Sequence, residues 1–175
     1  MIAEVFGLSE DVFALFRRFR HDLFNDLQIL SGHMQLGRST EVLRADLNVV
    51  IERIQEVSRL FSCKNDQLAL LLWFWQEQAR DREVSISFEI DQPSALIDIA
   101  RLADASDLVT AALDEIVLLD DEEHWLHVRV DGSTPALCLT FPILPKKGVI
   151  ETYRSDSNIT CTETDEQLEY CFPLT

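Results

Sequence analysis

Apolar residues recur at alternating steps of three and four positions along the first part of the chain. Between residues 9 and 36 only the polar Arg20 interrupts this stripe, whose apolar members are Phe13, Phe16, Leu23, Leu27, Leu30 and Met34. Because this spacing keeps side chains on one face of an α-helix, it predicts a long amphipathic helix over residues 9–36. Ser9 fits its N-cap and Gly37 its stop.

A second stripe of the same period follows after a short polar turn. It predicts a helix that begins at Ser39 or Thr40 and reaches about Phe61, with apolar members Leu43, Leu47, Val50, Ile54, Val57 and Phe61. Two helices joined by so short a turn form an antiparallel hairpin. A lone hairpin leaves one apolar side of each helix in water, so we expect two hairpins to pair as a homodimeric four-helix bundle.

The pattern changes after the polar break at residues 62–66. Strand-like alternation and hairpin turns appear among shorter helices. The pattern therefore predicts a helical domain at residues 1–62, followed along the chain by an α+β domain at residues 66–175. The expected elements are a helix at 67–80, a strand at 84–90, one or two helices at 95–121 with a break near 104–106, strands at 124–130 and 136–144 joined by the Asp131-Gly132 turn, and strands at 158–164 and 167–174.

Charge is distributed unevenly between these two parts. The net charge is −16, yet residues 1–62 hold 7 basic and 9 acidic residues, whereas residues 63–175 hold 8 and 22. This acidity disfavours binding to nucleic acid or to an anionic membrane surface. The longest apolar run, residues 68–75, is far shorter than a bilayer span, and the N-terminus does not resemble a signal peptide, so we expect a cytoplasmic protein.

The four cysteines, Cys63, Cys138, Cys161 and Cys171, form no CxxC pair and have no histidine at metal-ligand spacing. A zinc site or a disulfide framework is therefore disfavoured, and we expect free thiols.

The candidate chemistry lies on the first helix, around His21. Arg17, His21 and Asn25 are four residues apart and share one face, with Arg18 beside them. In the heptad His21 lies next to a core position, so its ring is expected on the bundle surface. An exposed imidazole among arginines can accept a phosphoryl group, and Asp22 can hydrogen-bond the other ring nitrogen, although a helix turns the next residue by about 100°.

The alternative is an ordinary solvated histidine on a charged helix face. For the other histidines of the chain, a structural or solvated role fits better than a catalytic one; they are His33, His124 and His127.

Residues 20–38, RHDLFNDLQILSGHMQLGR, resemble the phosphoacceptor helix of the family that contains sporulation initiation phosphotransferase B and the citrate/C4-dicarboxylate-type sensor histidine kinases. The resemblance implies that His21 is phosphorylated and that Asp22 and Asn25 assist it. It also implies a helical hairpin followed by a kinase-ATPase-like α/β sandwich. The exposed neighbours expected to dock a partner are Arg17, Arg18, Arg20, Phe24 and Gln28.

Members of this family either use ATP or only relay phosphate, and the second domain favours the relay. An ATP site of this type needs glycine-rich turns, but that domain has only Gly132 and Gly148, and neither lies in such a motif. The helix expected to carry a magnesium-binding asparagine has Thr110 or Asp114 instead. Residues 145–157 are too short for an ATP lid, and Lys146 and Lys147 fit a solvated loop better than a phosphate site.

The sequence therefore predicts a degenerate ATPase-like domain and a phosphotransferase that is not an ATP-dependent kinase. The resemblance implies that His21 relays a phosphoryl group between the aspartates of response-regulator receiver domains, with magnesium held by the regulator and no cofactor on this chain. The sporulation setting rests on the resemblance alone. Rival interpretations are a non-catalytic dimeric module derived from a sensor kinase, an active kinase fragment and, less favoured, a nucleic-acid-binding helical dimer.

Overall fold

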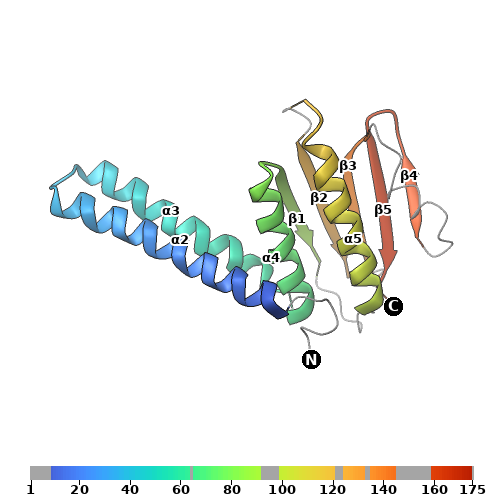
Figure 1. Ribbon diagram of the computed structural model, residues 1–175, viewed down its shortest axis with the longest axis horizontal. Helices are drawn as coiled ribbons and strands as arrows, with labels where there is room; N and C mark the ends of the chain where they lie inside the picture. The colour runs from blue at the N-terminus through green and yellow to red at the C-terminus, as the bar shows by residue number, and fades with distance from the viewer. Residues whose placement is uncertain are drawn as a thin grey trace. The chain divides into compact units, whose positions relative to one another are not determined.

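The computed structural model describes residues 9–63, 65–91, 99–120, 124–132, 135–144 and 159–174. Figure 1 shows a long helical hairpin and a layer of helices against a sheet. The chain divides into two compact units, Met1–Ser62 and Cys63–Thr175. Among the described helices, none combines the length and the apolar composition that crossing a membrane requires.

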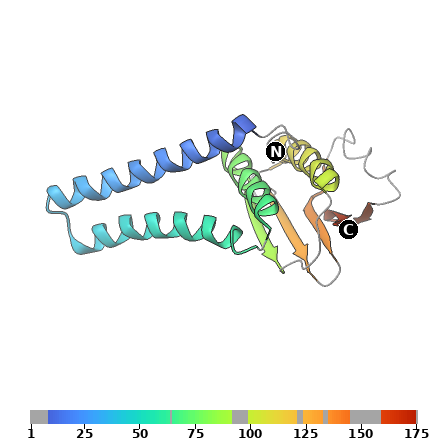
Figure 2. The same cartoon turned by 90° about the horizontal axis from the view of Figure 1, so that it is seen from below.

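The first unit is an antiparallel pair of helices, α2 (Ser9–Gln35) and α3 (Thr40–Leu60), which run side by side in both views (Figures 1 and 2). Gly37 ends α2 as predicted, with a φ of 62° that favours glycine. The Gly37 N–H donates to the Met34 carbonyl and the Arg38 N–H to the His33 carbonyl, both at 3.1 Å. These two bonds form a Schellman motif, which closes the helix and turns the chain into α3.

The start of α3 agrees with the sequence as well. Ser39 takes the extended N-cap conformation, with φ −62° and ψ 156°. The backbone N–H of Glu41 and the Ser39 side chain hydrogen-bond the Glu41 carboxylate and hold its pKa below the ordinary value. An acid in the first turn also suits the positive end of the helix dipole.

The apolar stripe of each helix splits into two sets. One set is buried or half-buried in the hairpin and consists of Leu23, Leu30, Leu43, Val50 and Val57. The other set remains 39–68% exposed and consists of Phe13, Phe16, Leu27, Met34, Leu47, Ile54 and Phe61. One chain therefore covers only about half of the stripe that the heptads define.

A polar contact ties the two helices together near the turn. His33 Nδ1 lies 2.6 Å from Asp46 Oδ2, with side chains 32% and 19% exposed. This cross-hairpin contact gives His33 the structural role that was one of the two expected for it.

The second unit is a two-layer α+β domain, which confirms the predicted fold class. Its elements are α4 (Asp66–Asp81), β1 (Ser85–Ile90), α5 (Ile99–Ile116), β2 (Trp125–Asp131), β3 (Ala136–Pro142), β4 (Thr160–Glu163) and β5 (Gln167–Pro173). The five-stranded sheet has the order β1-β2-β3-β5-β4, with β1 parallel to β2 and the other pairs antiparallel. Helices α4 and α5 cover the same face of the sheet (Figures 1 and 2).

The core of this unit lies between the helices and the sheet. Strand residues alternate, so that Leu126, Val128 and Val130 of β2 are buried while their neighbours are half-buried. The apolar side predicted for α4 is at most 1% exposed and consists of Leu68, Leu71, Leu72, Trp75 and Ala79. The Asn65 side chain caps α4 by accepting a hydrogen bond from the Leu68 N–H at 2.9 Å.

The break expected near residues 104–106 is wrong, because α5 is one continuous helix. The polar side chains that suggested a break form hydrogen bonds within the continuous helix or to α4. Trp75 Nε1 donates to Ser106 Oγ at 3.3 Å, and Thr110 Oγ1 donates to the Ser106 carbonyl at 3.0 Å. Ala105 is fully buried, so the apolar face of α5 runs through the expected break.

The expectation of free thiols is wrong for one pair, because Cys138 and Cys171 form a disulfide. These cysteines are 33 residues apart in sequence but directly opposite each other in the β3–β5 register. Such a pairing arises from the sheet and leaves no motif in the sequence. Cys63 and Cys161 are free thiols, as expected.

Reducing the Cys138–Cys171 bond removes a covalent closure of a 33-residue segment. We expect a reductant to lower the free energy of unfolding by about 2–4 kcal/mol, mainly by freeing the unfolded chain. Urea denaturation with and without reductant measures the change. The C138S/C171S variant is the control, since its midpoint should not respond to reductant, and an equal response in both proteins would contradict the assignment.

Candidate functional site

His21 lies in the middle of α2 with its side chain 72% exposed. The heptad had placed it beside the core stripe, and this exposure agrees with that position. A ring presented by a long helix is held at the backbone by the helical hydrogen bonds, while its reactive edge stays open to a partner.

Two side chains approach the same nitrogen of this ring. Asn25 Nδ2 lies 3.2 Å from His21 Nδ1, and Asp22 Oδ1 lies 3.4 Å from it. The Asn25 contact spans one helical turn, as the shared face predicted, whereas the Asp22 contact is long because adjacent residues diverge on a helix. No described residue hydrogen-bonds the other nitrogen, Nε2.

Asp22 and Asn25 make different demands on Nδ1. A carboxylate accepts, so contact with Asp22 requires a proton on Nδ1, whereas the Asn25 amide N–H needs a bare Nδ1. With the proton on Nδ1, Nε2 carries the lone pair and is the nucleophile. The balance between these two contacts therefore selects which nitrogen can react.

Asp22 is also in contact with α3, through a residue that sequence reasoning missed. Arg53 Nη1 lies 3.5 Å from Asp22 Oδ2, and Arg53 Nε donates to Asp26 Oδ2 at 2.8 Å. The three side chains are between 16% and 29% exposed, so they lie partly inside the hairpin.

A signal for Arg53 was present in the sequence. Arg53 follows Val50 by three residues and precedes Val57 by four, so it occupies the inner face of α3. Asp22 and Asp26 are one turn apart on α2 and form an acidic row. A basic residue on an inner face opposite such a row indicates a cross-helix ion pair.

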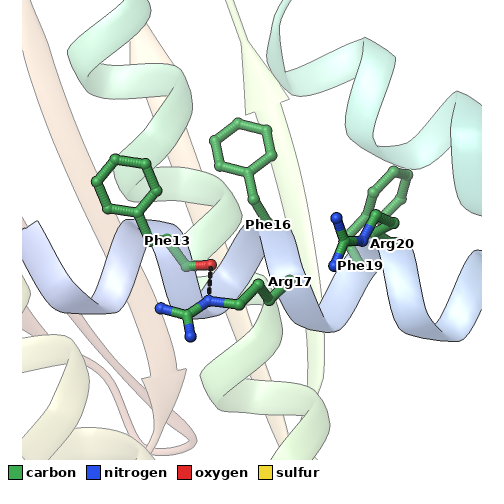
Figure 3. Close-up of a pocket in the computed structure, with 5 residues that line it drawn as sticks. All are labelled: Phe13, Phe16, Arg17, Phe19 and Arg20. Atoms are coloured by element: carbon green, nitrogen blue, oxygen red, sulfur yellow. Dashed lines mark hydrogen bonds between the residues drawn. The ribbon is translucent and has the colours of Figure 1, made fainter.

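The predicted docking residues lie on the surface of α2. Arg17, Arg18, Arg20, Phe24 and Gln28 are all exposed. Phe24 is 58% exposed, although a large aromatic side chain is usually buried at least in part. Arg17 does not reach the His21 ring, because its Nε donates to the Phe13 carbonyl at 3.3 Å (Figure 3).

A pocket of about 380 Å³ opens one to two turns before His21. It is lined by Phe13, Phe16, Arg17, Phe19 and Arg20. Figure 3 shows the Phe13 and Phe16 rings on one side of α2 and the Arg17 guanidinium on the other. Aromatic rings next to arginines are common at protein interfaces, so this part of α2 has the composition of a docking surface.

In the second unit, the positions considered for magnesium already have partners within the protein. Asp114 Oδ1 lies 2.7 Å from Arg82 Nη2 and 2.8 Å from Arg82 Nε. Thr110 Oγ1 donates to the Ser106 carbonyl and lies 3.4 Å from Gln78 Oε1. Residues 145–157, with Lys146, Lys147 and Gly148, lie outside the described residues.

The other histidines have structural partners. His127 Nδ1 lies 2.9 Å from Ser87 Oγ and His127 Nε2 lies 3.7 Å from Glu89, both on β1. His124 Nε2 lies 3.1 Å from the Leu119 carbonyl. These partners lie on β1 and in the segment after α5, and the sequence around the two histidines did not reveal them.

Among solved structures, the chain is similar to the blue-light activated histidine kinase EL346 of Erythrobacter litoralis. The match has 10% sequence identity and a TM-score of 0.38, and it covers 89% of this chain and 60% of that one. This chain therefore spans less than two thirds of that kinase chain's length. No curated protein matches in sequence.

A family model does match the hairpin. Residues 4–63 fit the model described as the Sensor kinase SpoOB-type, alpha-helical domain. This match covers both helices, α2 and α3, with His21 in the first, and it confirms the resemblance predicted from residues 20–38. The N-terminal hairpin is thus similar to the SpoOB-type sensor-kinase alpha-helical domain, and the match covers about a third of the chain.

Proposed function

We propose that this protein is a histidine phosphotransferase that relays a phosphoryl group between response-regulator aspartates through His21, in a two-component phosphorelay. The observation that carries the proposal is the environment of the His21 ring. Asp22 and Asn25 both lie within 3.4 Å of Nδ1, while Nε2 has no described hydrogen-bond partner on a ring that is 72% exposed.

The transfer requires mainly that Nε2 be positioned in line with the phosphorus and the oxygen that leaves. The Nε2 lone pair attacks the phosphorus of an aspartyl phosphate on the incoming regulator, the bond from phosphorus to the aspartate oxygen breaks, and the carboxylate leaves with the electron pair. Nδ1–H donates to Asp22 and so offsets the positive charge that the phosphorylated ring carries. The reverse reaction passes the group to the aspartate of a second regulator.

The reaction places no cofactor on this chain. Magnesium belongs to the acidic pocket of the regulator, where it neutralises the phosphoryl oxygens. The proposed docking surface consists of Arg17, Arg18, Arg20, Phe24 and Gln28, whose exposed aromatic and cationic groups suit a partially acidic receiver domain.

The proposed active form is a homodimer. The seven exposed members of the two apolar stripes form an apolar seam on the hairpin, with Leu27 at 41% and Ile54 at 43% exposure. Water contact with so long an apolar seam is unfavourable, and pairing two hairpins into a four-helix bundle removes it.

The second unit is proposed to be a degenerate ATPase-like domain that serves packing or partner docking. The Asp114 carboxylate, at a position considered for magnesium, is already paired with Arg82. A sporulation pathway is a part of the proposal that rests on the sequence resemblance. A cytoplasmic location is also proposed, because the longest apolar run, residues 68–75, is far shorter than a bilayer span.

The first test is transfer of labelled phosphate. Wild-type protein mixed with a phosphorylated response regulator should take up label, and His21→Ala should take up none, because the nucleophile is gone. His33→Gln is the matched control, a histidine change in the same helix that leaves the His21 ring untouched. Label that persists in His21→Ala would contradict the assignment, and no label with any regulator of the same organism would favour a non-catalytic dimeric module.

The dimer is tested by adding a charge to the exposed seam. Ile54→Glu should shift the sedimentation coefficient from dimer to monomer, because a carboxylate at the bundle core is left without water or a partner. Gln55→Glu adds the same charge one residue along, away from the stripe, and should remain dimeric. Equal behaviour of both variants would count against the bundle.

Nucleotide use is tested on the full chain. We expect Mg-ATP to leave the melting temperature unchanged and to produce no labelled His21, because the proposal assigns no nucleotide site to the second unit. A concentration-dependent rise in melting temperature, or label from γ-labelled ATP that His21→Ala abolishes, would replace the relay with an active kinase.

A further inference from the structure

We propose that Arg53, on the opposite helix of the hairpin, is a positioning residue that sets the reactive tautomer of His21 by orienting Asp22. This inference rests on the proposed function for its kinetic consequence, but its structural claim concerns the ring itself. It adds α3 to a site whose other members all come from α2.

The Asp22 carboxylate joins the two contacts through different oxygen atoms. Oδ2 faces Arg53 Nη1 at 3.5 Å, and Oδ1 faces His21 Nδ1 at 3.4 Å. Holding one oxygen toward α3 turns the other toward the ring. Without the guanidinium, this carboxylate, 29% exposed, would rotate freely between the ring and water.

Arg53 is itself held in place by Asp26, and a guanidinium held in this way can orient the Asp22 carboxylate. Its Nε donates to Asp26 Oδ2 at 2.8 Å, the shorter of its two ion-pair contacts. The guanidinium is planar and rigid, so fixing Nε also fixes the direction in which Nη1 points. Asp26 thus acts as the anchor and Asp22 as the group positioned.

The consequence reaches His21 because Asp22 and Asn25 compete for one nitrogen. When Asp22 is held toward the ring, Nδ1 keeps its proton and Nε2 keeps its lone pair. When Asp22 turns away, the Asn25 amide N–H, 3.2 Å from Nδ1, favours a bare Nδ1 and a proton on Nε2. A protonated Nε2 in a neutral ring has no lone pair with which to attack phosphorus.

The experiment measures the tautomer of His21 directly. Full-length protein labelled with ¹⁵N-histidine is examined by long-range ¹H–¹⁵N NMR at about pH 8.5, where an ordinary imidazole is neutral. We expect wild type to carry the proton mainly on Nδ1 and Arg53→Gln to shift the population toward Nε2–H. Arg44→Gln makes the same chemical change at an exposed position of α3 and should leave the tautomer unchanged.

Transfer kinetics provide the second measurement. In single-turnover labelling, Arg53→Gln should slow phosphoryl uptake by about 2- to 10-fold, which is the effect of losing one ordinary hydrogen bond. The dependence on regulator concentration should be unchanged, since Arg53 lies outside the docking surface. Arg53→Lys keeps the charge but not the two-pronged geometry, so it should recover the Nδ1–H population only in part.

The outcomes separate the two proposals. An unchanged tautomer in folded Arg53→Gln overturns the positioning role, whatever happens to the rate. If Arg53→Gln fails to fold, Arg53→Lys decides by the same spectrum, and a full wild-type tautomer there overturns the role. If wild type accepts no label but the tautomer shifts as expected, the relay function fails while the control of the ring by Arg53 stands.

Discussion

The structure depends on one packing constraint: two amphipathic helices joined by a tight turn bury only about half of their apolar stripe. Val50 is 6% exposed inside the hairpin, whereas Leu47 and Ile54, one turn away on either side of it, are 45% and 43% exposed. Each helix has two apolar edges and only one neighbour to cover them. A single hairpin therefore leaves one apolar edge of each helix exposed to water.

The same constraint explains why the polar site sits where it does. One sector of α2 lies outside both apolar edges and faces neither the hairpin interior nor the expected bundle core. His21 and Asn25 occupy that sector, whereas Asp22 and Asp26 turn toward α3 and are matched there by Arg53. The site thus runs from a half-buried ion pair to an exposed imidazole, and it is built on helices rather than on a loop.

Much of this could be predicted from local periodicity. The stripe of α2, its end at Gly37, the start of α3 and the apolar side of α4 follow from spacing and capping alone, and so does the exposure of His21. Relations between distant residues were harder to predict. The Cys138–Cys171 bond and the pairing of His127 with Ser87 require knowing which strands lie side by side, whereas the Arg53 contacts had a signal on the inner face of α3 that the sequence reasoning did not use. The expected break in α5 was wrong for a related reason, because the Ser106 hydroxyl accepts a hydrogen bond from Trp75 of another helix.

Two of the polar contacts between α2 and α3, His33 with Asp46 and Arg53 with Asp26, have a geometric consequence. From His33 back to Asp26 on α2 is seven residues, and from Asp46 forward to Arg53 on α3 is also seven. Both pairs therefore lie on a single antiparallel alignment, one heptad apart, with no slippage between them. Any change at the Gly37 turn that slid α3 along α2 would therefore break both contacts together and carry Arg53 away from Asp22, without altering any residue of the site.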